Sequence, residues 1–249
     1  WLAEFCSDHM ARLRGVACLN VDDVNVACAE LKRCAELGLS AAMIPVSPLP
    51  DKPYSHPIYE KLWWAAQDLD MPLILHITTP RGNIPGNETS SFDNTEWTSA
   101  TRSTMDHWVR HSLTSIIFSG AFDRYPNLRV GSAEHEGGWI PHWLNQMDWV
   151  YTERPNVYAD KGWRSRHGLP SEIWRRNMFC VFQEDGLAVQ LRHIIGVDNM
   201  MWGNDFSHAE SSWPESQRFL DQIFEGVPPE DRKKITSTNA AGLFGFDLN

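Results

Sequence analysis

Short apolar runs alternate with longer helical patterns along this chain, and this alternation limits the fold more than any other feature. Six of the runs are typical of buried strands, because they are short and rich in apolar and β-branched residues. They cover residues 15–20, 41–46, 71–77, 128–134, 177–183 and 200–205. Strands separated by helices form a parallel sheet, in which the carboxyl ends of all strands share one edge. We therefore predict an α/β fold with one functional edge.

Helical patterns fill most of the chain between these runs and all of its end. We predict helices over residues 22–37, 57–69, 103–118, 139–151, 187–195, 214–224, 229–235 and 239–244. A (β/α)8 TIM barrel typically has about 250 residues, and this chain has 249. The competing fold is an open doubly wound sheet, but no Gly-rich phosphate-binding fingerprint follows an early strand.

Six strands are too few for a closed eight-stranded barrel. We therefore predict that residues 1–249 form a single barrel domain that is incomplete at its N-terminus. The first two strands would then precede Trp1, and the chain does not open on a Met. On this count the visible strands are the third to the eighth of the barrel.

Three of the predicted strands end at, or within one residue of, His76, His135 and Asp205. Catalytic residues of barrel enzymes gather at these strand ends, because all of them converge on one mouth. Imidazole and carboxylate ligands suit Zn²⁺ and are acceptable to Mn²⁺. Each residue alone has a plainer interpretation, since a histidine can be structural and Asp205 can cap the next helix. Their shared edge favours a divalent metal site, with zinc as the first choice and manganese as the alternative.

Charge and composition exclude some partners. The chain has 22 Lys+Arg against 32 Asp+Glu, a net charge of −10, and no basic stripe that would bind nucleic acid. No apolar run reaches the 18 residues that a membrane span needs. Five cysteines without a CxxC pair, and no signal peptide, predict a cytoplasmic protein. Twelve Trp residues predict extensive helix packing and a homo-oligomer, in which some of them cover an interface.

The segment 78–101 is long, polar and rich in Gly, Pro, Asn, Ser and Thr. It follows the strand that ends on His76. Long loops at the carboxyl ends of barrel strands usually cover the substrate. We predict a lid or pocket wall here, with simple surface disorder as the alternative.

Several stretches together resemble the amidohydrolase-related family of metal-dependent barrels. The similarity is to the branch that includes aminocarboxymuconate-semialdehyde decarboxylase and aromatic-acid decarboxylases. Each stretch is weakly specific, but they occur in the family's order through nearly the whole chain. The stretches are residues 72–76, 122–129, 134–141, 202–208 and 239–246.

The resemblance implies roles for individual residues. His76 would be a metal ligand, and Asp205 would bind or face the metal and handle a proton. His135 would be a catalytic histidine near the substrate. Part of the family has a glutamate at the position of Glu134 instead, and this chain has both, so the sequence leaves open which of the two faces the site.

The resemblance also implies supporting or substrate-binding roles for His208, Glu134 and Trp139. The family's first strand normally carries a His-x-His or Glu-x-His pair of metal ligands. No His-x-His occurs in the 249 residues, so we expect that pair upstream of Trp1.

The family implies a metal-dependent enzyme that acts on a small-molecule carboxylic acid. The main hypothesis is a non-oxidative decarboxylase (carboxy-lyase) or a C–C hydrolase of a small aromatic or unsaturated carboxylic acid. The first alternative is a metal-dependent hydrolase of an ester, lactone or amide. The second is a barrel that binds a small molecule without metal and without catalysis. Family membership alone does not choose among them.

Overall fold

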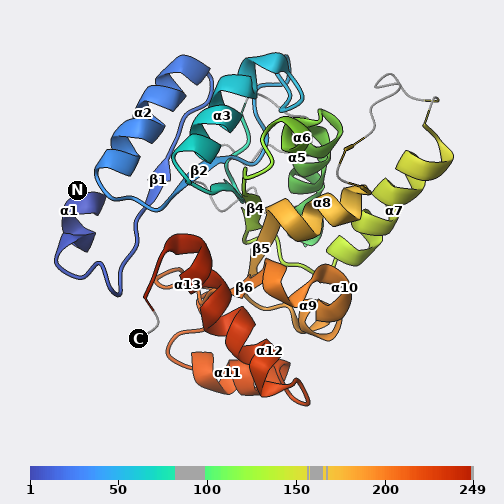
Figure 1. Cartoon of the computed structure of the whole chain (residues 1–249). Coiled ribbons are helices and arrows are strands. Elements are labelled where there is room, and N and C mark those ends of the chain that lie inside the picture. The colour runs from blue at the N-terminus through green and yellow to red at the C-terminus, as the bar shows by residue number, and fades with distance from the viewer. Residues whose placement is uncertain (82–98, 156, 158–164, 167, 248–249) are drawn as a thin grey trace.

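Six parallel strands form one sheet, and their order in the sheet is their order in the chain (Figure 1). The computed structural model describes residues 1–81, 99–155, 157, 165, 166 and 168–247. The strands are β1 (Val16–Cys18), β2 (Ala41–Pro45), β3 (Leu73–His76), β4 (Val130–Ala133), β5 (Met178–Phe182) and β6 (Met200–Trp202). All six fall inside the predicted strand ranges, and all six are shorter than predicted.

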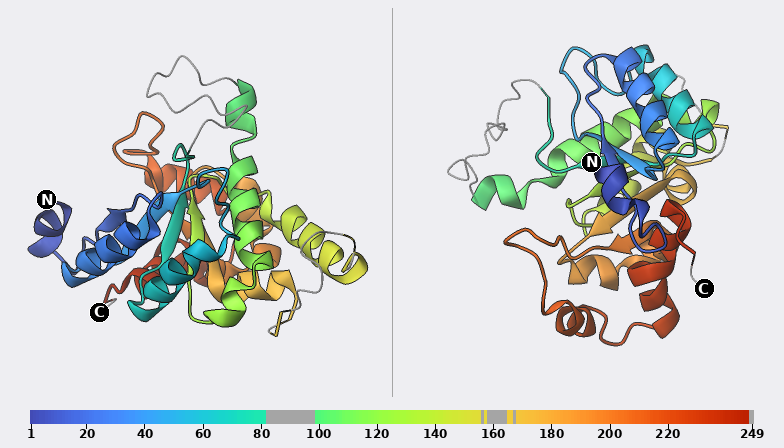
Figure 2. Two further views of the ribbon diagram at one scale, coloured as in Figure 1. Left: turned by 90° about the horizontal axis from the view of Figure 1, so that it is seen from above. Right: turned by 90° about the vertical axis from the view of Figure 1, so that its left-hand side faces the viewer.

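Helices and helical turns precede, connect and follow these strands. They are α1 (Leu2–Ser7), α2 (Val24–Glu36), η1 (Pro57–Tyr59), α3 (Glu60–Asp68), α4 (Ser99–Ser103), α5 (Asp106–Phe118), α6 (Ala121–Arg124), α7 (Ile140–Glu153), α8 (Pro170–Asn177), α9 (Gly186–Gln190), α10 (Arg192–Ile195), η3 (Val197–Asn199), α11 (Ser216–Ile223), α12 (Pro229–Lys233), the π-helical turn η4 (Lys234–Thr238) and α13 (Asn239–Phe244). Figure 2 shows the strands at the centre with helices around them.

The strand order distinguishes the two predicted architectures. A doubly wound sheet reverses its strand order at a switch point, whereas here each strand pairs in parallel with the next one along the chain. This is the winding of a barrel, as predicted. Within the described residues the sheet is open, with β1 and β6 at its two edges.

The sheet buries both faces, because successive side chains of a strand point to opposite sides. The outer face packs against the helices in one large cluster that includes the fully buried Trp63 and Trp174. The inner face is a smaller cluster of one residue from each of four strands. These are Ala41, Ile74, Phe179 and Met201. Side chains of α13 pack against this inner cluster, so the last helix covers part of the barrel interior.

Local signals explain where some helices begin. The Asp23 side chain accepts hydrogen bonds from the backbone N–H groups of Asn25 and Val26, which caps α2. Helix α8 was not among the predicted helices, although Pro170 in its first turn is a helix-start signal. The Glu172 carboxylate also accepts from the Leu169 N–H at 2.6 Å. The helix was missed because eight residues are too short for a clear apolar period.

Other sequence predictions have mixed outcomes. Among the Trp residues that were expected to pack helices or cover an interface, Trp63 is buried, whereas Trp64 and Trp149 are 56% and 43% exposed. Residues 82–98 of the predicted lid lie outside the described residues. None of the helices in the described part of the chain is both long and apolar enough to cross a membrane.

A glycine in β4 tests the packing of the barrel interior. A Cβ on Gly131 would lie 2.5 Å from the Phe179 carbonyl oxygen and closer still to the Phe179 ring. We expect Gly131→Ala to lower the free energy of unfolding by about 1–3 kcal/mol, because the core must shift to accept the methyl group. Gly242→Ala is the matched control, since nothing lies within 4 Å of its added Cβ. That change in α13 should stabilise by about 0.5–1 kcal/mol. Denaturant unfolding measures both, and equal effects would contradict this packing.

Candidate metal centre

Four ionisable side chains meet at the carboxyl edge of the sheet. His76 is the last residue of β3, Glu134 follows β4 directly, and Asp205 and His208 lie in the loop after β6. One ligand atom each from Glu134, Asp205 and His208 lies within 4.8 Å of the others. His76 Nε2 lies 3.0 Å from Glu134 Oε1. We call these four residues the carboxyl-edge cluster.

His76 is oriented by both ring nitrogens. Nδ1 lies 2.9 Å from the Ile77 carbonyl oxygen, so this nitrogen carries a proton and donates it. In the neutral ring the lone pair is then on Nε2, which faces Glu134. Burial opposes a charge on the ring, but the hydrogen bonds to Glu134 and to the Ile77 carbonyl outweigh it and raise the pKa of His76 above its usual value.

Glu134 lies close both to His76 and to Asp205. Burial favours its neutral acid, yet the hydrogen bond and charge of His76 outweigh burial and hold the pKa of Glu134 below its usual value. The carboxylate is therefore ionised at neutral pH. It lies close to a second carboxylate, that of Asp205. Two carboxylates at this separation repel each other unless a cation or a shared proton lies with them.

Asp205 is paired with the exposed His208. His208 Nδ1 lies 2.9 Å from Asp205 Oδ2, and the side chains are 70% and 17% exposed. The hydrogen bond from the exposed His208 therefore holds the less exposed Asp205 carboxylate in place. Backbone contacts hold the loop as well, since the Ser211 hydroxyl donates to the Asn204 carbonyl at 2.7 Å and the Ser212 N–H donates to the same oxygen at 3.2 Å.

Unusual backbone conformations mark the same edge. The described residues include five non-glycine residues with positive φ, and four of them follow β3, β4 or β6. These are Thr78 (φ 60°), Glu134 (φ 63°), Glu136 (φ 56°) and Asp205 (φ 56°). Such strain concentrates at functional sites, where the surrounding structure enforces it.

His135 and Trp139 lie outside the cluster. His135 is 1% exposed, and neither ring nitrogen has a hydrogen-bond partner within the described structure. Burial, with a smaller effect from the charge of His76, lowers the pKa of His135 to about 3. Trp139 precedes α7 and donates from Nε1 to the His135 carbonyl at 2.8 Å. Of the two candidates that follow β4, Glu134 is the one that reaches His76 and Asp205. A catalytic role for His135 stays a prediction.

The cluster offers suitable ligands for a divalent metal ion. Imidazole nitrogen and carboxylate oxygen are the ligands that Zn²⁺ and Mn²⁺ accept in proteins. The hydrogen bond from His76 Nδ1 to a carbonyl is the usual partner of a metal-binding histidine, because it leaves Nε2 free to coordinate. The adjacent carboxylates supply the negative charge that a dication would neutralise.

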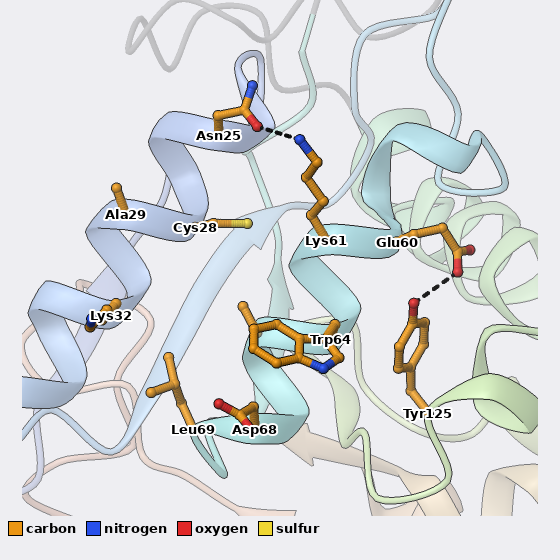
Figure 3. A pocket seen from close by; sticks show the side chains of 11 residues that line it. Asn25, Cys28, Ala29, Lys32, Glu60, Lys61, Trp64, Asp68, Leu69 and Tyr125 are labelled. Atoms are coloured by element: carbon orange, nitrogen blue, oxygen red, sulfur yellow. Dashed lines mark hydrogen bonds between the residues drawn. The ribbon is translucent and has the colours of Figure 1, made fainter.

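A cavity of about 700 Å³ lies elsewhere, on the outer side of the barrel between α2 and α3 (Figure 3). Across it, Lys61 donates to the Asn25 side chain at 2.9 Å. The Tyr125 hydroxyl donates to Glu60 at 3.0 Å. No residue of the carboxyl-edge cluster lines this cavity, so it is not part of the candidate metal centre.

The strand order and the position of the cluster are those of a barrel enzyme, whose active site lies at the carboxyl ends of its strands. Residues 1–246 match the sequence model of the amidohydrolase family, and the chain belongs to that family. This confirms the resemblance inferred from the ordered stretches.

Two relatives illustrate the similarity in sequence. A γ-resorcylate decarboxylase of Rhodococcus jostii RHA1 is 28% identical, over 99% of this chain and 74% of its own length. A 2-amino-3-carboxymuconate-6-semialdehyde decarboxylase of Dictyostelium discoideum is 23% identical, over 100% of this chain and 67% of its own length.

Solved structures establish the barrel fold. The 5-carboxyvanillate decarboxylase of Sphingomonas paucimobilis superposes with a TM-score of 0.78 at 21% identity, over 99% of this chain and 70% of that one. A dihydroxybenzoic acid decarboxylase of Polaromonas sp. JS666, with bound manganese and 2-nitroresorcinol, has a TM-score of 0.75 at 22% identity. It covers 98% of this chain and 72% of its own.

The pairing of His76 with Glu134 predicts a measurable titration. In metal-free protein, Glu134→Gln should lower the pKa of His76, because the charge that raises it is lost while burial remains. A histidine NMR titration measures this shift. Glu60→Gln is the control, since Glu60 binds Arg124 and Tyr125 instead. An unchanged His76 pKa in Glu134→Gln would mean that the two side chains are not in contact.

Proposed function

We propose that the chain is a metal-dependent, non-oxidative carboxy-lyase of a small aromatic carboxylic acid. The single observation that carries the proposal is the carboxyl-edge cluster, in which two carboxylates and two histidines meet at the mouth of an amidohydrolase barrel. The decarboxylase relatives support the reaction type.

The metal would be held by His76 Nε2 and Asp205, with Glu134 and His208 as further ligands or as partners of those ligands. A divalent cation there would bind the substrate carboxylate and a neighbouring oxygen and would stabilise negative charge that develops during the reaction. Zinc suits the mixed nitrogen and oxygen ligands. The manganese in the Polaromonas structure supports Mn²⁺ as the second candidate.

The remaining chemistry is a proton transfer. When the bond between the ring and the carboxylate breaks, CO₂ leaves and its electron pair stays on the ring carbon. That carbon must then accept one proton. Asp205 lies at the strand end where the substrate would bind. Its Oδ2 contacts His208 Nδ1. We assign Asp205 as the residue that holds and delivers this proton, a role that typically contributes about 10²–10⁴-fold in rate.

A neighbouring residue keeps Asp205 in place. His208 Nδ1 donates to one carboxylate oxygen of Asp205, which limits rotation of the side chain. The ionised Glu134 is balanced by His76. A homo-oligomeric assembly, a cytoplasmic location and a single domain over residues 1–249 stay predictions.

Metal content tests the site. We expect purified protein to contain about one equivalent of a divalent metal, and the double variant His76→Ala, Asp205→Ala to contain far less, because two ligands are lost. Elemental analysis measures both. Asp198→Asn is the control, since Asp198 is exposed and pairs with Lys234. Equal metal in the double variant and the parent protein would refute the proposed site.

Product analysis tests the reaction. With 2,6-dihydroxybenzoate and 5-carboxyvanillate as probes, we expect CO₂ and the decarboxylated phenol in equal amounts. Asp205→Asn should lower kcat about 10²–10⁴-fold. Cleavage of esters, lactones or amides without CO₂ would support a hydrolase instead. Binding of the probes without any turnover by the metal-loaded protein would support a non-catalytic barrel.

A further inference from the structure

The turn between β4 and α7, which carries Glu134, is held to the neighbouring strand and its loop. The Glu134 N–H donates to the Val181 carbonyl of β5 at 3.3 Å. The Glu136 carboxylate accepts from the backbone N–H groups of Gln183 and Glu184 at 3.2 and 3.3 Å. The turn therefore has two attachments to the end of β5 and the residues that follow it.

A third attachment comes from Asp185. Its Oδ2 accepts from the Gly137 N–H at 2.8 Å and from the Gly138 N–H at 2.6 Å. These contacts join residues that are 48 and 47 positions apart in the chain. They are the reverse of the Glu136 contacts, since each loop supplies a carboxylate to the backbone of the other.

The two glycines allow this close approach. A Cβ on Gly138 would lie 3.2 Å from Asp185 Oδ2, and one on Gly137 would lie 3.1 Å from the Ala188 Cβ. Both distances are tighter than ordinary van der Waals contact. The carboxylate of Asp185 thus sits directly against the backbone of the turn.

A helix cap alone does not account for Asp185. Its Oδ1 accepts from the Ala188 N–H at 2.8 Å, which is the cap of the five-residue α9. The cap uses only this oxygen. The other oxygen is committed entirely to Gly137 and Gly138, which belong to a different loop.

We propose that Asp185 is a positioning residue for the carboxyl-edge cluster, because it fixes the turn that aims the Glu134 carboxylate at His76. Glu134 and Glu136 both have left-handed backbone conformations, which side-chain-bearing residues adopt only when their surroundings enforce them. Without Asp185 the turn relaxes and the Glu134 carboxylate moves away from His76. The consequence for metal binding rests on the proposed function, whereas the consequence for the His76 contact does not.

The experiment compares Asp185→Ala and Asp185→Asn with the parent protein. Alanine removes all three hydrogen bonds, and asparagine keeps a single acceptor oxygen, so its effect should be smaller. Asp23→Ala is the matched control, because Asp23 also caps a helix with two backbone N–H groups but belongs to α2. Gly138→Ala disturbs the same contact and keeps the carboxylate. Thermal unfolding of each variant records its loss of stability.

Two further measurements separate positioning from stability. In metal-free protein at fixed pH, the ring ¹⁵N shifts of His76 report its contact with Glu134. In folded protein, titration with Mn²⁺ gives the metal dissociation constant. We expect Asp185→Ala to change the His76 shifts and to weaken Mn²⁺ binding about tenfold or more, as loss of residues that orient metal ligands typically does. Asparagine and Gly138→Ala should give smaller changes, and Asp23→Ala none.

The outcomes distinguish the two proposals. Unchanged His76 shifts in Asp185→Ala, with a stability loss like that of Asp23→Ala, would reduce Asp185 to a helix cap and overturn the positioning role. If the parent protein binds no divalent metal, the proposed function fails, and the His76 shifts still decide the role of Asp185. If Asp185→Ala does not fold, the shifts and the Mn²⁺ affinity of Asp185→Asn and Gly138→Ala decide it.

Discussion

The consecutive order of the strands is the constraint on which the candidate metal centre depends. Adjacent strands lie about 4.8 Å apart, so β4 and β6, which are separated by β5, would be roughly 10 Å apart in a flat sheet. Yet ligand atoms of Glu134 and Asp205 lie within 4.8 Å of each other. The difference is made up by the length of the two side chains and by the left-handed turns that carry them. Consecutive strand order keeps β4 and β6 only two strands apart, whereas a reversal of order would carry one of the two strands to a distant edge.

Burial and charge act in opposite directions within the cluster, and the balance decides which residues are charged at neutral pH. Both His76 and Glu134 lose solvent, but each gains an opposite charge, so the pKa of His76 is raised and that of Glu134 is lowered. His135 is buried beside them without such a partner, and its pKa falls to about 3. It is therefore neutral at physiological pH and does not compete for the carboxylates.

Much of the fold could be predicted from the sequence, because apolar runs and strand–helix alternation depend only on burial. The six strands and their polar ends follow from that pattern, including His76 as the last residue of β3. The choice between Glu134 and His135 did not follow from it. Strict alternation from Ala133, which packs on the inner cluster, sends residue 134 outward and residue 135 inward. The left-handed backbone at Glu134 breaks this alternation. The pattern of apolar and polar residues does not predict such a backbone angle.

The left-handed backbone conformation also explains why several neighbouring residues make hydrogen bonds that hold these turns. A glycine would adopt a left-handed conformation without cost, whereas other residues lose about 1 kcal/mol or more. At Glu134 and Asp205 the chain cannot use glycine, because the same residue must turn the backbone and supply the carboxylate. The cost has to be offset by neighbours, and those neighbours carry no chemistry of their own. Asp185 and Glu136 hold one turn from the β5 side, and the Asn204 carbonyl holds the other through Ser211 and Ser212. A site of this kind is therefore sensitive to residues that never approach the substrate, and those residues are found by following the backbone N–H groups of the turn rather than its side chains.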